Sequence, residues 1–552
     1  MEKALIKIKN SRGNYLEPVI VLVLSVLSVI VSRKWIQPQI FDMTKVNDNK
    51  HIFIECVFFI ILLIFYKYII KFIKEIKNKE QYYCLWLKKF LIFAIINCIF
   101  LILIWPGHWI WDETTLLTAA TKTEVNIWQS YITVIYYALC MMAIPYACGI
   151  TIIQSLFIAF VMSYVSTNLY MIYKKKSVSI ALYLVMLIPS VILNNLRPLR
   201  LQVYAYILLL LFCILIFDKI YKRKLTLHRS LVLLILSSLL ILWRSEGIIF
   251  CIVIPVLMLI VYNKKGMNYI KTALIVVLNI IILLSYNRVL NSMKDWVEQA
   301  KKKYSVTVYV NPLSQMIQED LHGKDLDKNL ENIDKVLDLE ILKKYPSYTE
   351  IPAFWEEDNF LRENFEEHLS EFKKSYIKIV LDNPILFLKA RIKTFLATCY
   401  YENNIGTPGI SLIKYYTDSN NSDAFTDDFL QNYKFTSAIN AKVKVNVETF
   451  LMGAKLKTQG YNKIILYLFW NVLPVMIICT INIVISFIKK RYEYLCMFLA
   501  LMCNSAIIFL TAPANYFMYY FPMYVTGIIV SICFWCEIKK DKFNQNVTEN
   551  VN

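Results

Sequence analysis

Long apolar runs recur along this chain and constrain its fold more than any other feature. A membrane-spanning helix needs about 20 mostly apolar residues to cross roughly 30 Å of hydrocarbon. Twelve runs of about that kind occur, near residues 15–32, 52–70, 88–105, 150–172, 178–194, 201–218, 230–243, 247–262, 270–288, 464–487, 494–511 and 517–537. Only 18% of the residues are charged, whereas soluble domains have roughly a quarter. We therefore predict an all-α integral membrane protein with about 12 transmembrane helices.

Lysine and arginine are concentrated in every second loop between these runs, as in the cytoplasmic loops of membrane proteins. Lys174–Lys176 and Lys222–Lys224 are two of these basic clusters. The alternation predicts a multi-pass protein of the cell membrane with both termini in the cytoplasm. The Lys-, Asn- and Ile-rich composition points to a low-GC bacterium, so we expect this membrane to be a bacterial plasma membrane. The net charge of +19 then reports topology, so we expect the lipid bilayer, and no nucleic acid, among the partners.

The runs divide the chain into three predicted domains. Residues 1–288 form an N-terminal membrane domain with about nine spans and an acidic outer loop at 106–130. Residues 289–463 form an external, mainly helical soluble domain with 25 Asp+Glu and 23 Lys+Arg. Residues 464–552 form a C-terminal membrane domain with three spans and a cytoplasmic tail. Residues 128–146 are predicted as a re-entrant or interfacial helix, because one more span would reverse every later loop. Residues 376–400 are predicted as an amphipathic helix on the membrane surface.

The acidic motif WPGHWIWDE, residues 105–113, follows the third run at the predicted outer surface. A carboxylate in an aromatic, partly dry site can have a shifted pKa and act as a general base. Asp112 and Glu113 are therefore the candidate catalytic residues, and Trp109 and Trp111 the candidate walls of a substrate pocket. The alternatives are that Asp112 caps the following helix and that the tryptophans anchor the chain at the membrane interface.

Three arginines lie in short loops on the predicted outer side, where basic residues should be scarce. They are Arg197 and Arg200 in NNLRPLRLQ and Arg244 in LWRSEGI. A guanidinium grips phosphate oxygens through two hydrogen bonds, so these residues are candidate ligands of a donor phosphate. The alternatives are an Arg244–Glu246 ion pair and an Arg197 that reaches lipid headgroups. In PANYFMYYFPMY, residues 513–524, Tyr516 and Tyr520 are candidate pocket residues together with Glu246, or belong to an interfacial aromatic belt.

With these features the chain resembles the GT-C superfamily of membrane glycosyltransferases, including protein mannosyltransferases and bacterial cell-surface glycan transferases. The stretches VNPLSQMIQ (310–318) and LDNPILFLKARI (381–392) also resemble members of this superfamily. The resemblance implies transfer of a sugar from a polyprenyl-phosphate donor to a glycan or lipid acceptor, with Asp112 as the base. Asn515 stands where many members have a basic residue, so phosphate binding is assigned to the three arginines.

Some branches of this superfamily use a divalent cation and others do not. The resemblance therefore implies no definite cofactor and leaves a divalent cation open. Asp112, Glu113 and Glu246 are the residues that could hold such a cation.

Two other functions stay open: a lipid-linked glycan flippase or transporter, and a polysaccharide polymerase or ligase. Transporters usually have related halves, and no internal repeat is visible in this sequence. A nucleotide-powered pump is not expected, because the chain has no P-loop motif. The pair Cys533 and Cys536 lies inside the last run without a second pair, which favours packing over metal binding.

Overall fold

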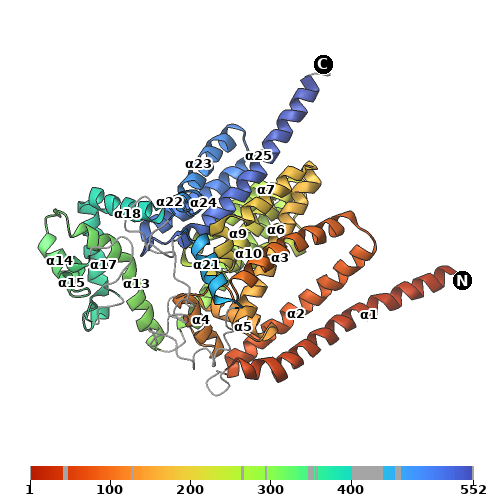
Figure 1. The fold of residues 1–552 in the computed structure, drawn as a ribbon, viewed down its shortest axis with the longest axis horizontal. Coiled ribbons are helices and arrows are strands. Elements are labelled where there is room, and N and C mark those ends of the chain that lie inside the picture. The colour runs from red at the N-terminus through yellow and green to blue at the C-terminus, as the bar shows by residue number, and fades with distance from the viewer. Residues whose placement is uncertain are drawn as a thin grey trace. The chain divides into compact units, whose positions relative to one another are not determined.

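The structure is a computed structural model that describes residues 2–41, 48–125, 129–262, 266–291, 295–345, 354, 359–400, 439–453 and 462–549 (Figure 1). Every regular element within these residues is a helix, and their isolated bridge joins Leu337 to Leu361. The prediction of an all-α protein is therefore confirmed for the described part of the chain.

Ten segments of the described chain are long and apolar enough to cross a membrane. They are Leu16–Gln39, Asn49–Lys77, Gln81–Leu103, Ala147–Tyr173, Arg200–Ile220, Ser245–Tyr262, Tyr269–Leu290, Lys463–Ile488, Tyr492–Thr511 and Phe517–Lys540. An eleventh results if α7 (Lys176–Met186) and α8 (Pro189–Asn195) form one span bent by 68°. The bend fits Pro189, which has no N–H to continue a helix. The helices are thus those of a multi-pass membrane protein.

The count of about 12 spans stays a prediction. The run 230–243 forms α10 (Leu227–Trp243), which has 17 residues and is shorter than the other spans. The stretch 128–146 contains α5 (Tyr131–Ala143), with 13 residues. Its length is below that of a complete span, and its relation to the membrane also stays a prediction.

By its internal contacts the chain divides into two compact units. The first unit comprises Met1–Val203 with Ser411–Thr449, and the second Tyr204–Ile410 with Phe450–Asn552. These limits differ from the expected boundaries at 288 and 463. One reason is that α21 (Ala441–Leu451), which we expected in the external domain, bonds to the loop after α3 (Gln81–Leu103) in the first unit.

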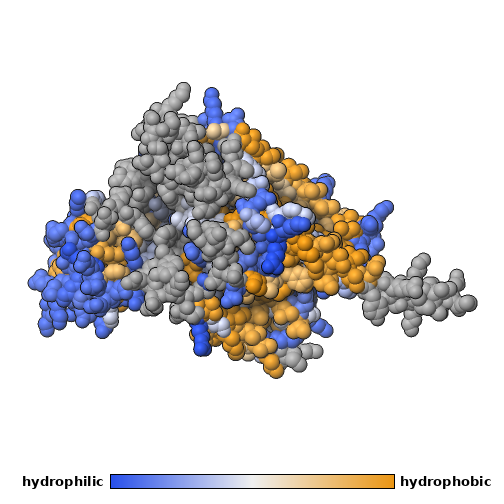
Figure 2. Space-filling model, turned by 90° about the horizontal axis from the view of Figure 1, so that it is seen from below, coloured by the Kyte–Doolittle hydropathy of each residue, from blue (hydrophilic) through white to orange (hydrophobic). Residues whose placement is uncertain are grey.

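Helix pairs build the first unit. Helix α1 (Glu2–Val31) packs against α2 (Asp48–Lys77), and α3 packs along α6 (Ala147–Tyr173). Many apolar side chains of α1 and α2 are exposed, as expected of helices that face lipid. Figure 2 shows the resulting hydrophobic surface at its right. Helix α3 ends just before Pro106, because the residue that precedes a proline disfavours helical geometry.

The second unit is organised around α9 (Arg200–Ile220), most of which is buried. Near its end, Asp218 accepts hydrogen bonds from Tyr262 at 2.5 Å and Arg229 at 2.9 Å. These bonds tie α9 to α11 (Phe250–Tyr262) and α10. Lys219 pairs with Glu493 at 2.9 Å, which joins α9 to α24 (Tyr492–Thr511). The same unit also contains α12 (Gly266–Asn291), α23 (Leu473–Ile488) and α25 (Phe521–Glu549).

A cluster of amphipathic helices in the second unit corresponds to the mainly helical part that we expected within 289–463. It consists of α13 (Asp295–Met316), α14 (Leu326–Asp334), α15 (Leu339–Lys344), α17 (Phe365–Asp382) and α18 (Pro384–Thr398). Its apolar core includes Val310, Leu313 and Phe372. The surface of α14, α15 and α17 is mostly hydrophilic, at the left of Figure 2. The cluster thus has an apolar core and, over these helices, a mostly polar surface.

Candidate functional site

The loop between α3 and α4 (Trp111–Thr121) carries the acidic motif and is held by buried backbone hydrogen bonds. The N–H group of His108 donates to the carbonyl of Leu196 at 2.9 Å, and Thr151 Oγ1 donates to the carbonyl of Pro106 at 3.1 Å. Gly107 has a φ of +121°, and a β-carbon there would lie 2.9 Å from the Leu196 carbonyl oxygen. This turn therefore needs glycine both for its backbone angle and for its close approach to Leu196.

The two acidic residues that open α4 have different surroundings. Glu113 is fully buried, and its Oε2 accepts a hydrogen bond from the N–H of Ile110 at 3.1 Å. Ile110 has no side-chain acceptor, so Glu113 supplies the cap that we had considered for Asp112. Asp112 is partly exposed, and no hydrogen bond or ion pair with another described residue engages its carboxylate.

Arg197 lies beside Glu113, 84 residues away in the sequence. Its Nε donates to Glu113 Oε1, and both side chains are buried. Burial raises the pKa of Glu113 above its ordinary value, and the Arg197 cation opposes that rise. The backbone of Arg197 is held too, because Gln154 Nε2 donates to its carbonyl at 2.8 Å. Arg197 thus points into the protein and not toward lipid headgroups.

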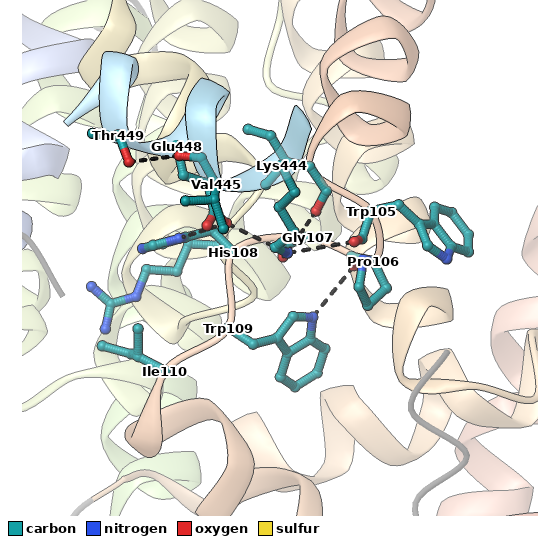
Figure 3. A network of polar contacts seen from close by, with 12 residues as sticks. Trp105, Pro106, Gly107, His108, Trp109, Ile110, Lys444, Val445, Glu448 and Thr449 are labelled. Atoms are coloured by element: carbon teal, nitrogen blue, oxygen red, sulfur yellow. Dashed lines mark hydrogen bonds and ion pairs between the residues drawn. The ribbon is translucent and has the colours of Figure 1, made fainter. Parts of the chain in front are cut away.

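A second buried ionic network holds the loop between α3 and α4. Lys444 and Glu448 of this network lie above the loop in Figure 3. Lys444 on α21 donates to the carbonyls of Ile104 at 2.8 Å and Gly107 at 2.5 Å. Its Nζ lies 3.4 Å from Glu448 Oε1, which is also 3.2 Å from His108 Nδ1. Burial lowers the pKa of Lys444 to about 8, although Glu448 favours its charged form. An ammonium group and a carboxylate thus fix the backbone that leads into the acidic motif.

The remaining predicted residues of the first unit have mixed positions. Trp109 is fully buried, with Nε1 3.4 Å from the Pro106 carbonyl and its ring 6.3 Å from that of Tyr137. It is therefore a packing residue of the loop and not an interfacial anchor. Arg200 is partly buried at the start of α9. The side chain of Trp111 lies outside the described residues, so its predicted role in a pocket stays a prediction.

In the second unit, Arg244 lies between α10 and the short helix η3 (Ser245–Ile249). It is buried and pairs with Glu246 through two hydrogen bonds, Nε to Oε2 at 3.0 Å and Nη2 to Oε1. The Arg244–Glu246 ion pair, which was the alternative to phosphate binding by Arg244, is therefore present. Its guanidinium carbon lies 5.9 Å from the ring centroid of Tyr204. The buried Nη1 of Arg244 has no hydrogen-bond partner among the described residues.

The tyrosine-rich segment belongs to the same unit. Tyr520, in η4 (Phe517–Tyr520), is buried, and its ring lies 5.5 Å from that of Phe395. Tyr516 is partly buried, and its ring lies 6.0 Å from that of Tyr519. Tyr520 thus packs inside the protein, whereas Tyr516 keeps an accessible face.

The structure thus brings Asp112, Glu113, Arg197 and Trp109 together in the first unit, and Arg244 with Glu246 in the second. Sequence reasoning missed His108, Lys444 and Glu448. The spacing of Lys444 and Glu448, four residues apart on one helix, was the single local signal. Among the described residues, no group of three or more His, Cys, Asp or Glu side chains could hold a metal ion.

Comparison of the chain with protein-family models, with curated proteins and with solved structures finds no match.

Proposed function

We propose that this chain is a membrane glycosyltransferase of the GT-C type. It would move a sugar from a polyprenyl-phosphate donor to a glycan or lipid acceptor on the outer face of the membrane. Asp112 would be the general base. The many membrane-spanning helices support a lipid-linked donor, because such a donor reaches its enzyme from within the bilayer. The resemblance of WDE (111–113), VNPLSQMIQ and LDNPILFLKARI to GT-C stretches supports the sugar-phosphate chemistry.

The contrast between Asp112 and Glu113 is the observation that carries this proposal. A general base needs a carboxylate that its substrate can reach and that no cation already occupies. Asp112 is partly exposed and unengaged among the described residues, while its neighbour Glu113 is buried against Arg197. We therefore assign catalysis to Asp112, and we assign Glu113 and Arg197 to holding the first turn of α4 in place.

The proposed reaction is a single displacement at the anomeric carbon. Asp112 takes the proton from an acceptor hydroxyl, and the hydroxyl oxygen forms a bond to the anomeric carbon. The bond from that carbon to the phosphate oxygen breaks, and the electron pair leaves with the polyprenyl phosphate. Arg200, which belongs to the same unit as Asp112, is the group that we assign to the departing phosphate. The role of Arg244 in phosphate binding stays a prediction from the sequence. In-line attack inverts the anomeric configuration.

Membranes that contain the full-length protein provide the test. They are supplied with polyprenyl-phosphate sugars that are labelled in the sugar, one sugar at a time, and the release of polyprenyl phosphate is measured with the labelled product. Loss of a general base lowers rates by roughly 10²–10⁴-fold, so Asp112→Asn should lose transfer to about that extent. Glu124→Gln is the matched control, because Glu124 is an exposed carboxylate just after the same helix.

Three results would contradict the proposal. The first is full transfer by Asp112→Asn at a matched amount of protein. The second is movement of the labelled lipid across the membrane without cleavage, which is the behaviour of a flippase or transporter. The third is activity solely with preassembled lipid-linked oligosaccharides, which is the behaviour of a polysaccharide polymerase or ligase.

A further inference from the structure

The exposed face of α17 changes from polar to apolar along its length. In its first half, this face carries Glu367, Glu371 and Lys374. At the next positions of the same helical face lie Ile377 and Leu381, which are 55% and 72% exposed. A helix that is covered by water along its whole length has no reason to change in this way.

Helix α18 continues the apolar surface. Its exposed residues include Ile385, Leu388 and Ile392, which follow one another at helical spacing and are 80%, 49% and 43% exposed. Together with Ile377 and Leu381 on α17 they are five large exposed apolar side chains on two consecutive helices, which we name the α17–α18 stripe. A contiguous exposed apolar surface usually marks a site of interaction. The hydrophobic core of the cluster does not use these side chains, since none of them is among its members.

The opposite face of α18 is bound to the end of a membrane-spanning helix in the same unit. Arg391 is buried, and it donates to the carbonyls of Phe509 at 2.6 Å and Ala512 at 3.0 Å. Phe509 lies in the last turn of α24 and Ala512 directly follows the helix, whose span ends at Thr511. The ring of Phe395 lies 6.0 Å from that of Phe509. A span that ends at Thr511 would place α18 at the level of the bilayer surface.

Ion pairs flank the stripe. Lys378 pairs with Asp325, and Lys389 Nζ lies 2.6 Å from Glu319 Oε1. Long lysine side chains commonly keep their charge in water while their stems run along an apolar surface.

Helix α22 (Lys463–Phe469), at the start of another span of the same unit, also exposes apolar residues. Its Ile464 and Leu468 are 69% and 62% exposed.

We propose that the α17–α18 stripe is inserted into the headgroup and upper acyl region of the lipid bilayer. Its occupant is lipid, because α18 is bound directly to the end of a candidate membrane-spanning helix. An amphipathic helix of this kind lies in the plane of the interface with its apolar face in the lipid. The stripe then holds the α13–α18 cluster against the membrane. This inference does not depend on the proposed glycosyltransferase activity.

The test uses the full-length protein in phosphatidylcholine nanodiscs. An environment-sensitive fluorescent amino acid replaces Leu381, Ile385 or Leu388 singly, and Glu367 or Glu371 as controls on the polar half of α17. All five side chains are exposed, so the replacements should not disturb the core. We expect blue-shifted emission at the three stripe positions, with quenching by lipids that carry a nitroxide on the acyl chain. The two control positions should show emission typical of water and little quenching.

Two outcomes would overturn the inference. Emission typical of water at position 385, equal to that at 367, would show that the stripe faces solvent. Blue-shifted emission without quenching by nitroxide lipids would show that another protein surface, such as a second copy of this chain, covers the stripe.

Discussion

The buried pair formed by Glu113 and Arg197 permits a quantitative test of how the acidic motif is held. Three variants are compared with the wild type: Glu113→Gln, Arg197→Met, and the combination of both. Glutamine keeps an acceptor for the N–H of Ile110, and methionine keeps much of the volume of arginine. The substitutions therefore change charge more than shape.

The magnitude follows from the burial of both partners. Removal of one member of a buried ion pair leaves an uncompensated charge and typically costs about 3–5 kcal/mol. Replacement of both members by neutral groups is often close to neutral. We therefore expect each single variant to lose about 3 kcal/mol of unfolding free energy. The double variant should lose at least about 2 kcal/mol less than the sum of the two single losses.

The cost of Arg197→Met should depend on pH. Burial raises the pKa of Glu113, and the loss of the opposing cation raises it further. The folded protein then keeps a proton that the unfolded chain releases once the pH exceeds the ordinary pKa of a glutamate. The free energy of unfolding therefore falls as pH rises from the ordinary pKa of a glutamate to the raised pKa of Glu113 in the folded variant. The fall is up to about 1.4 kcal/mol per pH unit. The variant should be closer to the wild type at pH 5 than at pH 8, and the double variant should not show this dependence.

Unfolding in mixed micelles, followed by tryptophan fluorescence as the share of dodecyl sulfate increases, measures these free energies. Glu124→Gln is the control and should change stability by less than about 0.5 kcal/mol, since Glu124 is exposed. Additivity of the two single losses within about 0.5 kcal/mol would refute the pairing. A cost of Arg197→Met that is the same at pH 5 and pH 8 would refute the account of Glu113.

Three further substitutions test other contacts by the same unfolding measurement in dodecyl sulfate micelles. Burial lowers the pKa of Lys444 to about 8, so the unfolded chain holds more protons than the folded one above that pH. Wild-type stability should therefore rise relative to Lys444→Met between pH 8 and 10, whereas the exposed Lys442→Met should show no such trend. Gly107→Ala should cost about 1–3 kcal/mol through its positive φ and the close Leu196 carbonyl. Arg391→Met leaves two carbonyls at the end of α24 without their donor and should cost about 2–4 kcal/mol. Lys389→Met, on the same helix, should cost less than about 1 kcal/mol. Equal losses for Arg391→Met and Lys389→Met would contradict the role given to α18.

Features that depend on a short stretch of sequence could be predicted well. A run such as 494–511 forms a helix because every residue in it is apolar or tolerates a helix, and the structure has α24 there. The amphipathic stretch 376–400 is helical too, but the structure divides it between the end of α17 and α18 at Asn383, before Pro384. Its place on the membrane surface stays a prediction. The break of one expected span into α7 and α8 also has a local cause in Pro189.

The partners of the charged residues could not be predicted in the same way. Lys444 and Glu448 stand about 340 residues from the loop that they hold, and Arg197 stands 84 residues from Glu113. Sequence reasoning did not predict the Arg197–Glu113 pair or the bonds from α21 to the loop after α3. A buried ion pair forms where folding brings two charged groups together and removes their water. The residues next to either group in the sequence predict neither the approach nor the loss of water. The apolar runs thus follow from local chemistry, and which of two adjacent carboxylates stays available follows from the long-range packing that buries Glu113 beside Arg197 and leaves Asp112 partly exposed.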